Sequence, residues 1–117
     1  MDLSKKLQVP DGTPIFLIDE PPGFNPGVQI SKKATGAAVL VFAINSEALK
    51  ANAKLAIDAA KEDRLSWIAY PKAGQLGTDL NRDKLVQLMN RFGIESVRLV
   101  SIDDSWSAIR FRPSRGS

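Results

Sequence analysis

Short apolar runs, typical of buried strands, recur along the chain between turn residues and amphipathic stretches. The clearest run extends from Ala37 to Ile44 and is apolar at every position. Such continuity is expected of a strand that is covered on both faces of a sheet. Other runs, bounded by turn residues, predict further strands at residues 15–18, 28–30, 65–70, 97–102 and 106–112.

Two longer stretches have the spacing of amphipathic helices instead. In the first, Asn45 or Ser46 can serve as the N-cap. Apolar residues then recur at offsets typical of one helical face, namely Leu49, Ala53, Ala56, Ile57 and Ala60. In the second, Asn81 is the expected N-cap and Gly93 the expected left-handed residue after the helix. Its buried stripe is predicted to consist of Leu85, Leu88, Met89 and Phe92.

Strands that alternate with helices pair in parallel, whereas the short turn Asp103–Ser105 joins the last two strands as an antiparallel hairpin. We therefore predict an α/β fold, a three-layer Rossmann-like domain with a mostly parallel sheet of about six strands, a C-terminal antiparallel hairpin and two main helices. One domain is expected over residues 1–112, with a tail at 113–117. The direction of the 28–30 strand stays open, because residues 31–36 are too few for an ordinary parallel crossover.

The absence of both histidine and cysteine from the 117 residues excludes several chemistries. Thiol nucleophiles, Ser-His pairs, Cys/His zinc sites and disulfides cannot be built within one chain. Acid–base work would fall to Asp, Glu, Lys or Tyr, whose ordinary pKa values lie far from 7. Residues 1–6 lack the apolar core of a secretory signal, and the longest apolar run is too short to cross a bilayer. We predict a cytoplasmic protein without a membrane partner.

The net charge of +3 raises the question of nucleic-acid binding. Sixteen basic residues face thirteen acidic ones, and the excess equals the three C-terminal arginines Arg110, Arg112 and Arg115. A basic C-terminal edge is therefore the candidate for phosphate contacts, with Lys32–Lys33 as a second contribution. The alternative is that these are solvated charges on an exposed strand and tail.

Polar side chains gather where the predicted parallel strands end, which is where open α/β sheets bind ligands. The candidate ligand-binding residues are Asp19, Glu20, Gly23, Asn45, Ser46, Tyr70, Lys72, Asp79, Asp104 and Trp106. Glu20, Ser46 and Lys72 are expected to line one shared mouth, where the lysine would hold a phosphate or carboxylate. Each candidate also has an ordinary structural interpretation as a cap, a turn residue or a packing residue. No catalytic residue and no metal ligand is assigned.

Five segments carry a resemblance to known proteins: Pro21–Phe24, the strand around Val39, Trp67–Lys72, Thr78–Leu80 and Asp104–Arg110. They are similar to segments of a family of small, uncharacterised bacterial proteins with a domain of unknown function, a resemblance that implies no particular activity. The order of elements also resembles the C-terminal half of S-adenosylmethionine-dependent methyltransferases. Here Pro21-Pro22 remove two backbone donors from the loop that would hold the cofactor, so S-adenosylmethionine is not expected to bind.

The resulting hypothesis is a non-catalytic or degenerate Rossmann-like domain that binds a small anionic ligand or a protein partner. One alternative is a minimal S-adenosylmethionine-dependent methyltransferase that works by proximity. A second alternative is a weak nucleic-acid binder that uses the basic C-terminal edge. The 28–30 strand, if it lies at the edge of the sheet, would allow a homodimer.

Overall fold

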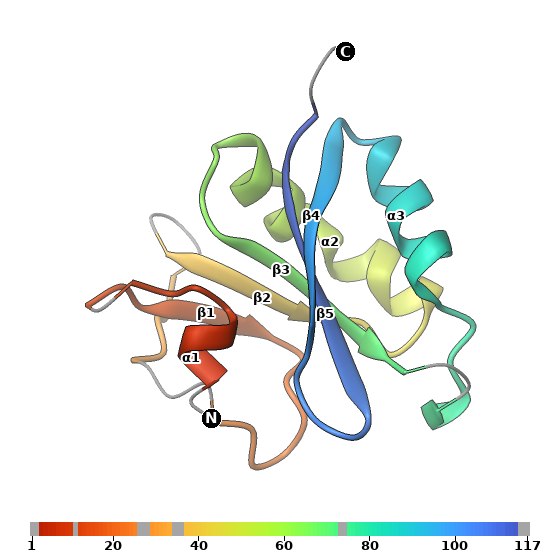
Figure 1. The fold of residues 1–117 in the computed structure, drawn as a ribbon, viewed down its shortest axis with the longest axis horizontal. Helices are drawn as coiled ribbons and strands as arrows, with labels where there is room; N and C mark the ends of the chain where they lie inside the picture. The colour runs from red at the N-terminus through yellow and green to blue at the C-terminus, as the bar shows by residue number, and fades with distance from the viewer. Residues whose placement is uncertain (1–2, 11, 26–28, 34–36, 73–74, 115–117) are drawn as a thin grey trace.

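A single mixed sheet of five strands forms the centre of the molecule in the computed structural model, which describes residues 3–10, 12–25, 29–33, 37–72 and 75–114. The strands, in the spatial order β1-β2-β3-β5-β4, are β1 (Ile15–Ile18), β2 (Ala38–Phe42), β3 (Ser66–Pro71), β4 (Ile94–Ser101) and β5 (Trp106–Pro113). The first three are parallel, whereas β5 runs antiparallel to both of its neighbours, β3 and β4 (Figure 1).

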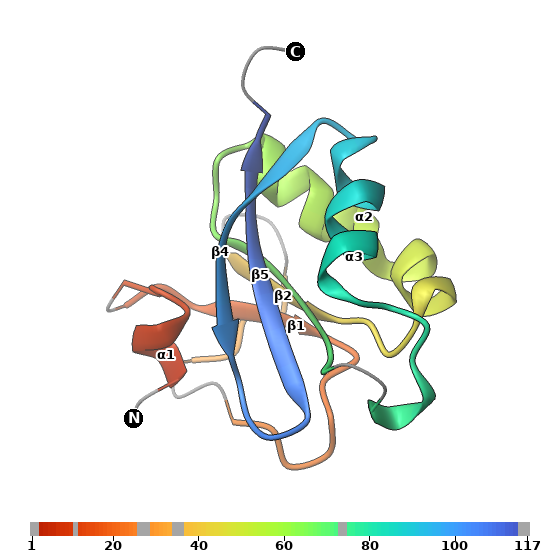
Figure 2. The same cartoon turned by 45° about the vertical axis from the view of Figure 1, so that its right-hand side comes forward.

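Two main helices, α2 (Ser46–Lys61) and α3 (Arg82–Asn90), lie side by side on one face of the sheet (Figures 1 and 2). Each begins at the predicted asparagine cap, whose side-chain oxygen accepts a hydrogen bond from a backbone N–H of the first turn. Asn45 accepts from Ala48 and Asn81 from Lys84, both at 2.8 Å. Shorter elements are the helix α1 (Leu3–Lys6) and the 3₁₀ turn η1 (Gln75–Gly77).

The predicted mostly parallel sheet of about six strands is wrong. Val28 lies outside the described residues, and Ile30 forms only an isolated parallel bridge to Ile15 rather than a strand. The bridge has two backbone bonds, from Ile15 N to Gln29 O at 2.9 Å and from Ser31 N to Ile15 O at 2.7 Å. The direction that the sequence left open is therefore parallel, but the pairing is too short to count as a sixth strand.

The C-terminal hairpin explains why the sheet is mixed rather than mostly parallel. The short connection at 102–105 forces β4 and β5 to be antiparallel. Of the two, β5 takes the interior position, between β3 and β4. Both faces of β5 are buried, with Ile109 and Phe111 on the side of the main helices and Trp106 on the other side. In contrast, Val97 and Leu99 of the edge strand β4 are about half exposed. Because β5 lies between β3 and β4, the sheet is mixed and the Rossmann-like order is lost.

The two faces of the sheet are covered differently: both main helices lie on one face, so the predicted three-layer Rossmann-like arrangement is also wrong. One face packs against α2 and α3. The other is covered by α1, the segment that follows it and Phe24 (Figure 1). Leu7 and Val9 are buried there, and the indole N–H of Trp67 donates to the carbonyl of Leu7 at 2.9 Å. This hydrogen bond connects the N-terminal segment to β3, while Gln8 accepts from Arg110 of β5 at 2.9 Å and Lys6 donates to the Ser101 carbonyl of β4 at 3.0 Å.

Most predictions about single helices and their ends are confirmed, unlike the predicted topology. The apolar stripe of α2 is buried as expected, and Gly93 has the left-handed backbone conformation predicted after α3, with a φ of 83°. Phe92 is an exception, since it lies beyond the end of the helix with 51% of its surface exposed. A residue after the last helical turn no longer follows the period of the helix, so the stripe ends at Met89.

Candidate functional site

The carboxyl ends of β1 and β2 open onto a cleft of about 560 Å³. We call it the carboxyl-end cleft. Its walls come from four parts of the chain, and the lining residues are Asp19, Glu20, Pro21, Pro22, Phe42, Ile44, Ala48, Leu76, Ser105 and Trp106. A volume of this size is typical of small-molecule sites. The cleft thus lies beyond the ends of the parallel strands β1 and β2, where the sequence predicted a site, although the sheet as a whole differs from the predicted one.

One wall of the cleft is acidic. Asp19 follows β1 directly and has a left-handed backbone conformation, with a φ of 57°, which aspartate tolerates better than most residues. Its Oδ2 accepts a hydrogen bond of 2.6 Å from the side-chain nitrogen of Asn52 in α2. Glu20 is exposed beside it. The only charged side chains in the lining are these two carboxylates, so the cleft favours positive charge.

The floor of the cleft is aromatic. Phe42, at the end of β2, lies between two other rings in edge-to-face contacts, with centroid distances of 4.9 Å to Phe24 and 5.1 Å to Trp106. Such pairs are favourable beyond their buried area, and they hold the floor rigid. Ile44 extends this apolar surface to the rim, where 44% of its side chain is exposed.

Leu76, which lines the cleft, combines a strained backbone with an exposed side chain. Its backbone has φ 55° and ψ 23°, the left-handed conformation that costs a residue such as leucine about 1–2 kcal/mol. Its side chain is 53% exposed, so little burial offsets that cost. Strained residues persist where the surroundings impose them and are concentrated at binding and catalytic sites.

Ser46 and Asp79, both predicted site residues, bind each other instead of facing the cleft. The carboxylate of Asp79 accepts from the backbone N–H of Ser46 at 2.8 Å and, through its other oxygen, from the Ser46 hydroxyl. It also accepts from Lys84 Nζ at 3.2 Å. The hydrogen bonds from Ser46 hold the pKa of Asp79 well below its ordinary value of 3.8. The pair connects α2 with the loop before α3.

Lys72 is committed to the hairpin. Its Nζ donates to Ser101 Oγ at 2.7 Å, and its backbone N–H donates to Ser105 O at 2.8 Å. Gln75 adds a third bond, from its side-chain nitrogen to the backbone carbonyl of Asp104 at 3.1 Å. Lys72 is absent from the lining of the carboxyl-end cleft, so the expected shared mouth of Glu20, Ser46 and Lys72 contains only the first of these.

The remaining candidates lie in several places. Tyr70 packs in the cluster beneath α2 and α3, on the face opposite Trp106. Burial raises the pKa of its phenol, a shift opposed by the nearby Arg82. Gly23 lines a separate shallow hollow next to the cleft, and its φ of 79° is one that glycine adopts without strain. The cleft therefore unites Asp19, Glu20 and Trp106 from the predicted set.

Sequence reasoning missed Ile44 and Leu76. Ile44 was assigned to a buried strand, but β2 ends two residues earlier, at Phe42. Leu76 carries no sequence signal, because a single leucine in a polar loop is ordinary and its left-handed conformation is visible only in the structure.

The basic C-terminal edge is partly occupied by internal contacts. Arg110 donates from Nη1 to Gln8 Oε1 at 2.9 Å, and Arg112 from Nε to the Pro113 carbonyl at 3.4 Å. Arg115 lies outside the described residues. Arg98, which sequence reasoning did not select, lies directly opposite Arg110 in the β4–β5 register. Nucleic-acid binding by this edge stays a prediction.

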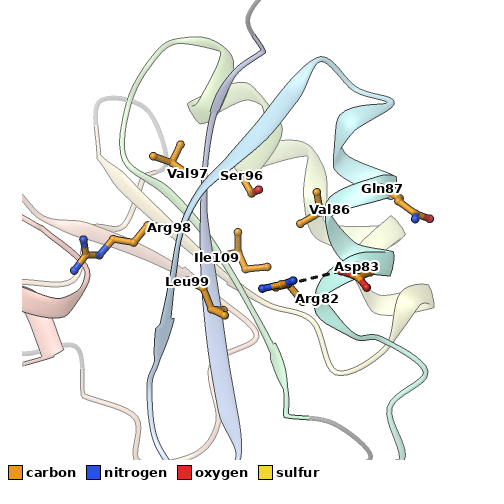
Figure 3. A pocket seen from close by; sticks show the side chains of 9 residues that line it. All are labelled: Arg82, Asp83, Val86, Gln87, Ser96, Val97, Arg98, Leu99 and Ile109. Carbon is orange, nitrogen blue, oxygen red and sulfur yellow. Dashed lines mark ion pairs between the residues drawn. The ribbon is translucent and has the colours of Figure 1, made fainter.

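A further hollow, of about 440 Å³, lies between α3 and β4 (Figure 3). Figure 3 shows Leu99 and Ile109 directed toward this hollow, whereas Arg98 points away from it. Arg82 and Asp83 form an ion pair of 3.7 Å at its rim. Both side chains are largely exposed, so the pair contributes little to stability.

No family model matches the chain, and neither does any curated protein. Within the described ranges, His, Cys, Asp and Glu side chains nowhere gather in a group of three that would hold a metal ion. No described helix is both long enough and apolar enough to span a bilayer.

Proposed function

We propose that this protein is a non-catalytic binding domain whose carboxyl-end cleft takes a small molecule with an apolar body and a positively charged group. The observation that carries the proposal is the strained, exposed Leu76, which lies in the same cleft as the acidic pair Asp19–Glu20. A ligand that covers Leu76 would gain apolar contact without a further conformational cost, because the strain already exists in the free protein.

The sign of the ligand's charge follows from the lining. An anion would have to approach Asp19 and Glu20, and the lysine expected to attract it, Lys72, donates to Ser101 instead. A protonated amine would find a carboxylate partner and an aromatic floor nearby. The electrostatics thus favour a cation over the anionic ligand expected from the sequence.

A binding role fits the side chains better than catalysis does. Ser105 is the only described lining residue with a hydroxyl, and no imidazole, thiol or lysine stands beside it in the cleft. Nucleophilic catalysis needs such a partner to remove the proton. The methyltransferase alternative and the cytoplasmic location stay predictions from the sequence.

The test compares three probes of matched shape by two-dimensional NMR: 2-phenylethylammonium, neutral 2-phenylethanol and anionic 3-phenylpropanoate. The ammonium probe is expected to bind best and to shift the amide signals of Ile44 and Leu76 and the indole signal of Trp106. Preferential binding of the carboxylate would reverse the proposed sign. Failure of all three probes to shift these signals would count against the cleft as a site.

Two charge variants test whether binding of the ammonium probe depends on the carboxylates of the cleft. Glu20→Gln should weaken binding of the ammonium probe by about fivefold, the value of one exposed charge pair. Asp58→Asn removes the same charge from α2 outside the cleft lining and is expected to leave binding unchanged.

A further inference from the structure

We infer that the groove between α2 and α3 docks an acidic amphipathic helix of another protein. This groove, of about 500 Å³, is lined by residues of α2 and by the end of α3, and it shares no lining residue with the carboxyl-end cleft. We call it the helix groove. Its lining residues are Leu49, Lys50, Ala53, Lys54, Ile57, Asp58, Lys61, Leu88, Met89, Arg91 and Phe92.

The floor of the helix groove is apolar along its length. On the α2 side, Leu49, Ala53 and Ile57 recur every four residues and form one continuous stripe at the bottom of the groove, where each is at most 8% exposed. On the α3 side, Leu88 is partly buried, and Phe92 keeps half of its surface exposed. An exposed phenylalanine at the end of an apolar groove is the kind of side chain that forms the anchor of a protein interface.

The rim of the groove is basic. Lys50, Lys54 and Lys61 follow α2 at offsets of four and seven residues and so lie along one side of the helix, while Arg91 stands at the end of α3. The only carboxylate in the lining is Asp58, which pairs with Lys54 at 3.1 Å. In the part of the chain that the structure describes, Lys50, Lys61 and Arg91 form no ion pair, so the rim has a net charge of +3.

The dimensions of the groove fit a helix. Leu49 and Lys61, at the two ends of its α2 side, are twelve residues apart, which corresponds to about 18 Å along the axis, or roughly three helical turns. A helix of that length presents apolar anchors at positions i, i+4 and i+7 to a groove and has flanking positions for acidic residues. Aspartate and glutamate at those flanks would meet the lysines of α2 on one side and Arg91 on the other.

The first experiment uses synthetic probes. The binding probe is a fluorescently labelled peptide of about 15 residues, long enough to populate a helix, with leucine on one face and glutamate beside it. A second peptide replaces every glutamate by lysine, and a third carries a central proline that breaks the helix. Fluorescence anisotropy should show binding of the first peptide alone. Equal binding of the lysine peptide would overturn the charge argument, and equal binding of the proline peptide would overturn the helical form.

The second experiment locates the binding. Lys50→Glu combined with Lys61→Glu is expected to weaken binding of the glutamate peptide by about tenfold or more, because both exposed rim charges change sign. Lys32→Glu combined with Lys33→Glu, at exposed positions outside the groove lining, matches the change in net charge and should have a much smaller effect. If the two double variants weaken binding equally, the attraction is general and the docking surface is refuted.

Phe92→Ala tests the apolar contribution. The side chain is half exposed in the free protein, so its removal should leave the fold intact, as circular dichroism and thermal unfolding will show. We expect a loss of peptide affinity of about fivefold or more, as for an interface anchor. Unchanged affinity in the folded variant would overturn the assignment of Phe92 as the anchor.

Discussion

The carboxylate of Asp79 accepts two hydrogen bonds from Ser46, a residue 33 positions earlier in the chain. One of these comes from the backbone N–H of Ser46 in the first turn of α2, so the helix has a second capping group besides Asn45. This contact connects the start of α2 to the loop that leads into α3. A cap supplied from so far along the chain forms only after the tertiary structure does.

Asp79→Asn should make stability less dependent on pH in the acid range. The folded-state pKa of Asp79 lies below the unfolded value, so its contribution is complete above the unfolded pKa and is lost as the pH falls through the folded pKa. Urea unfolding between about pH 5 and pH 2 should therefore show a smaller loss of stability for the variant than for the wild type. Asp104→Asn, in the exposed turn, is the control, and an identical response of the two variants would contradict the prediction.

Trp67→Phe should lower the free energy of unfolding by about 2–4 kcal/mol, because it removes a buried hydrogen bond, orphans the Leu7 carbonyl and leaves a small cavity. Guanidinium unfolding measures the loss. Limited proteolysis should show in addition that the segment before β1 becomes easier to cleave, since that bond connects it to β3. A loss below about 1 kcal/mol would mean that apolar packing and the bonds of Gln8 and Lys6 hold the segment without the indole bond.

Two variants at Leu76 can separate the effect of this residue on stability from its effect on ligand binding. Leu76→Gly should be more stable than Leu76→Ala by about 1 kcal/mol, because glycine accepts the left-handed backbone and alanine does not. Both variants lose the side chain that lines the carboxyl-end cleft, so both should bind the ammonium probe more weakly than the wild type. Thermal unfolding measures the difference in stability, and the NMR titration measures the loss of probe binding. A less stable glycine variant would show that the backbone at residue 76 is not strained.

Arg98→Thr should raise stability by about 0.5 kcal/mol, because Arg98 lies opposite Arg110 across β4 and β5 and threonine suits a strand. The matched control is Arg112→Thr, which removes an arginine opposite Glu95 and is expected to lower stability instead. The difference between the two variants in urea unfolding should shrink at high salt, where exposed charges are screened. The same sign for both variants would contradict the argument.

Part of the candidate site could be predicted from the sequence. Asp19, Glu20 and Trp106, which the sequence places near the ends of the parallel strands, line one cleft in the structure, although whether they bind a ligand stays a prediction. Lys72 lies outside that lining, because its ammonium group donates to Ser101, a contact between distant residues that sequence position does not show. Tyr70 lies on the face opposite Trp106, because strand residues alternate between the two faces of a sheet.

The sequence by itself determined the elements whose causes are local. The apolar run of β2, the asparagine caps of α2 and α3, and the turn that makes β4 and β5 a hairpin all depend on residues a few positions apart. Only the tertiary structure decided the insertion of β5 beside β3, the strained backbone of Leu76 and the exposure of Phe92. These depend on competition between distant segments for the same buried surface, and no local pattern records the outcome of that competition.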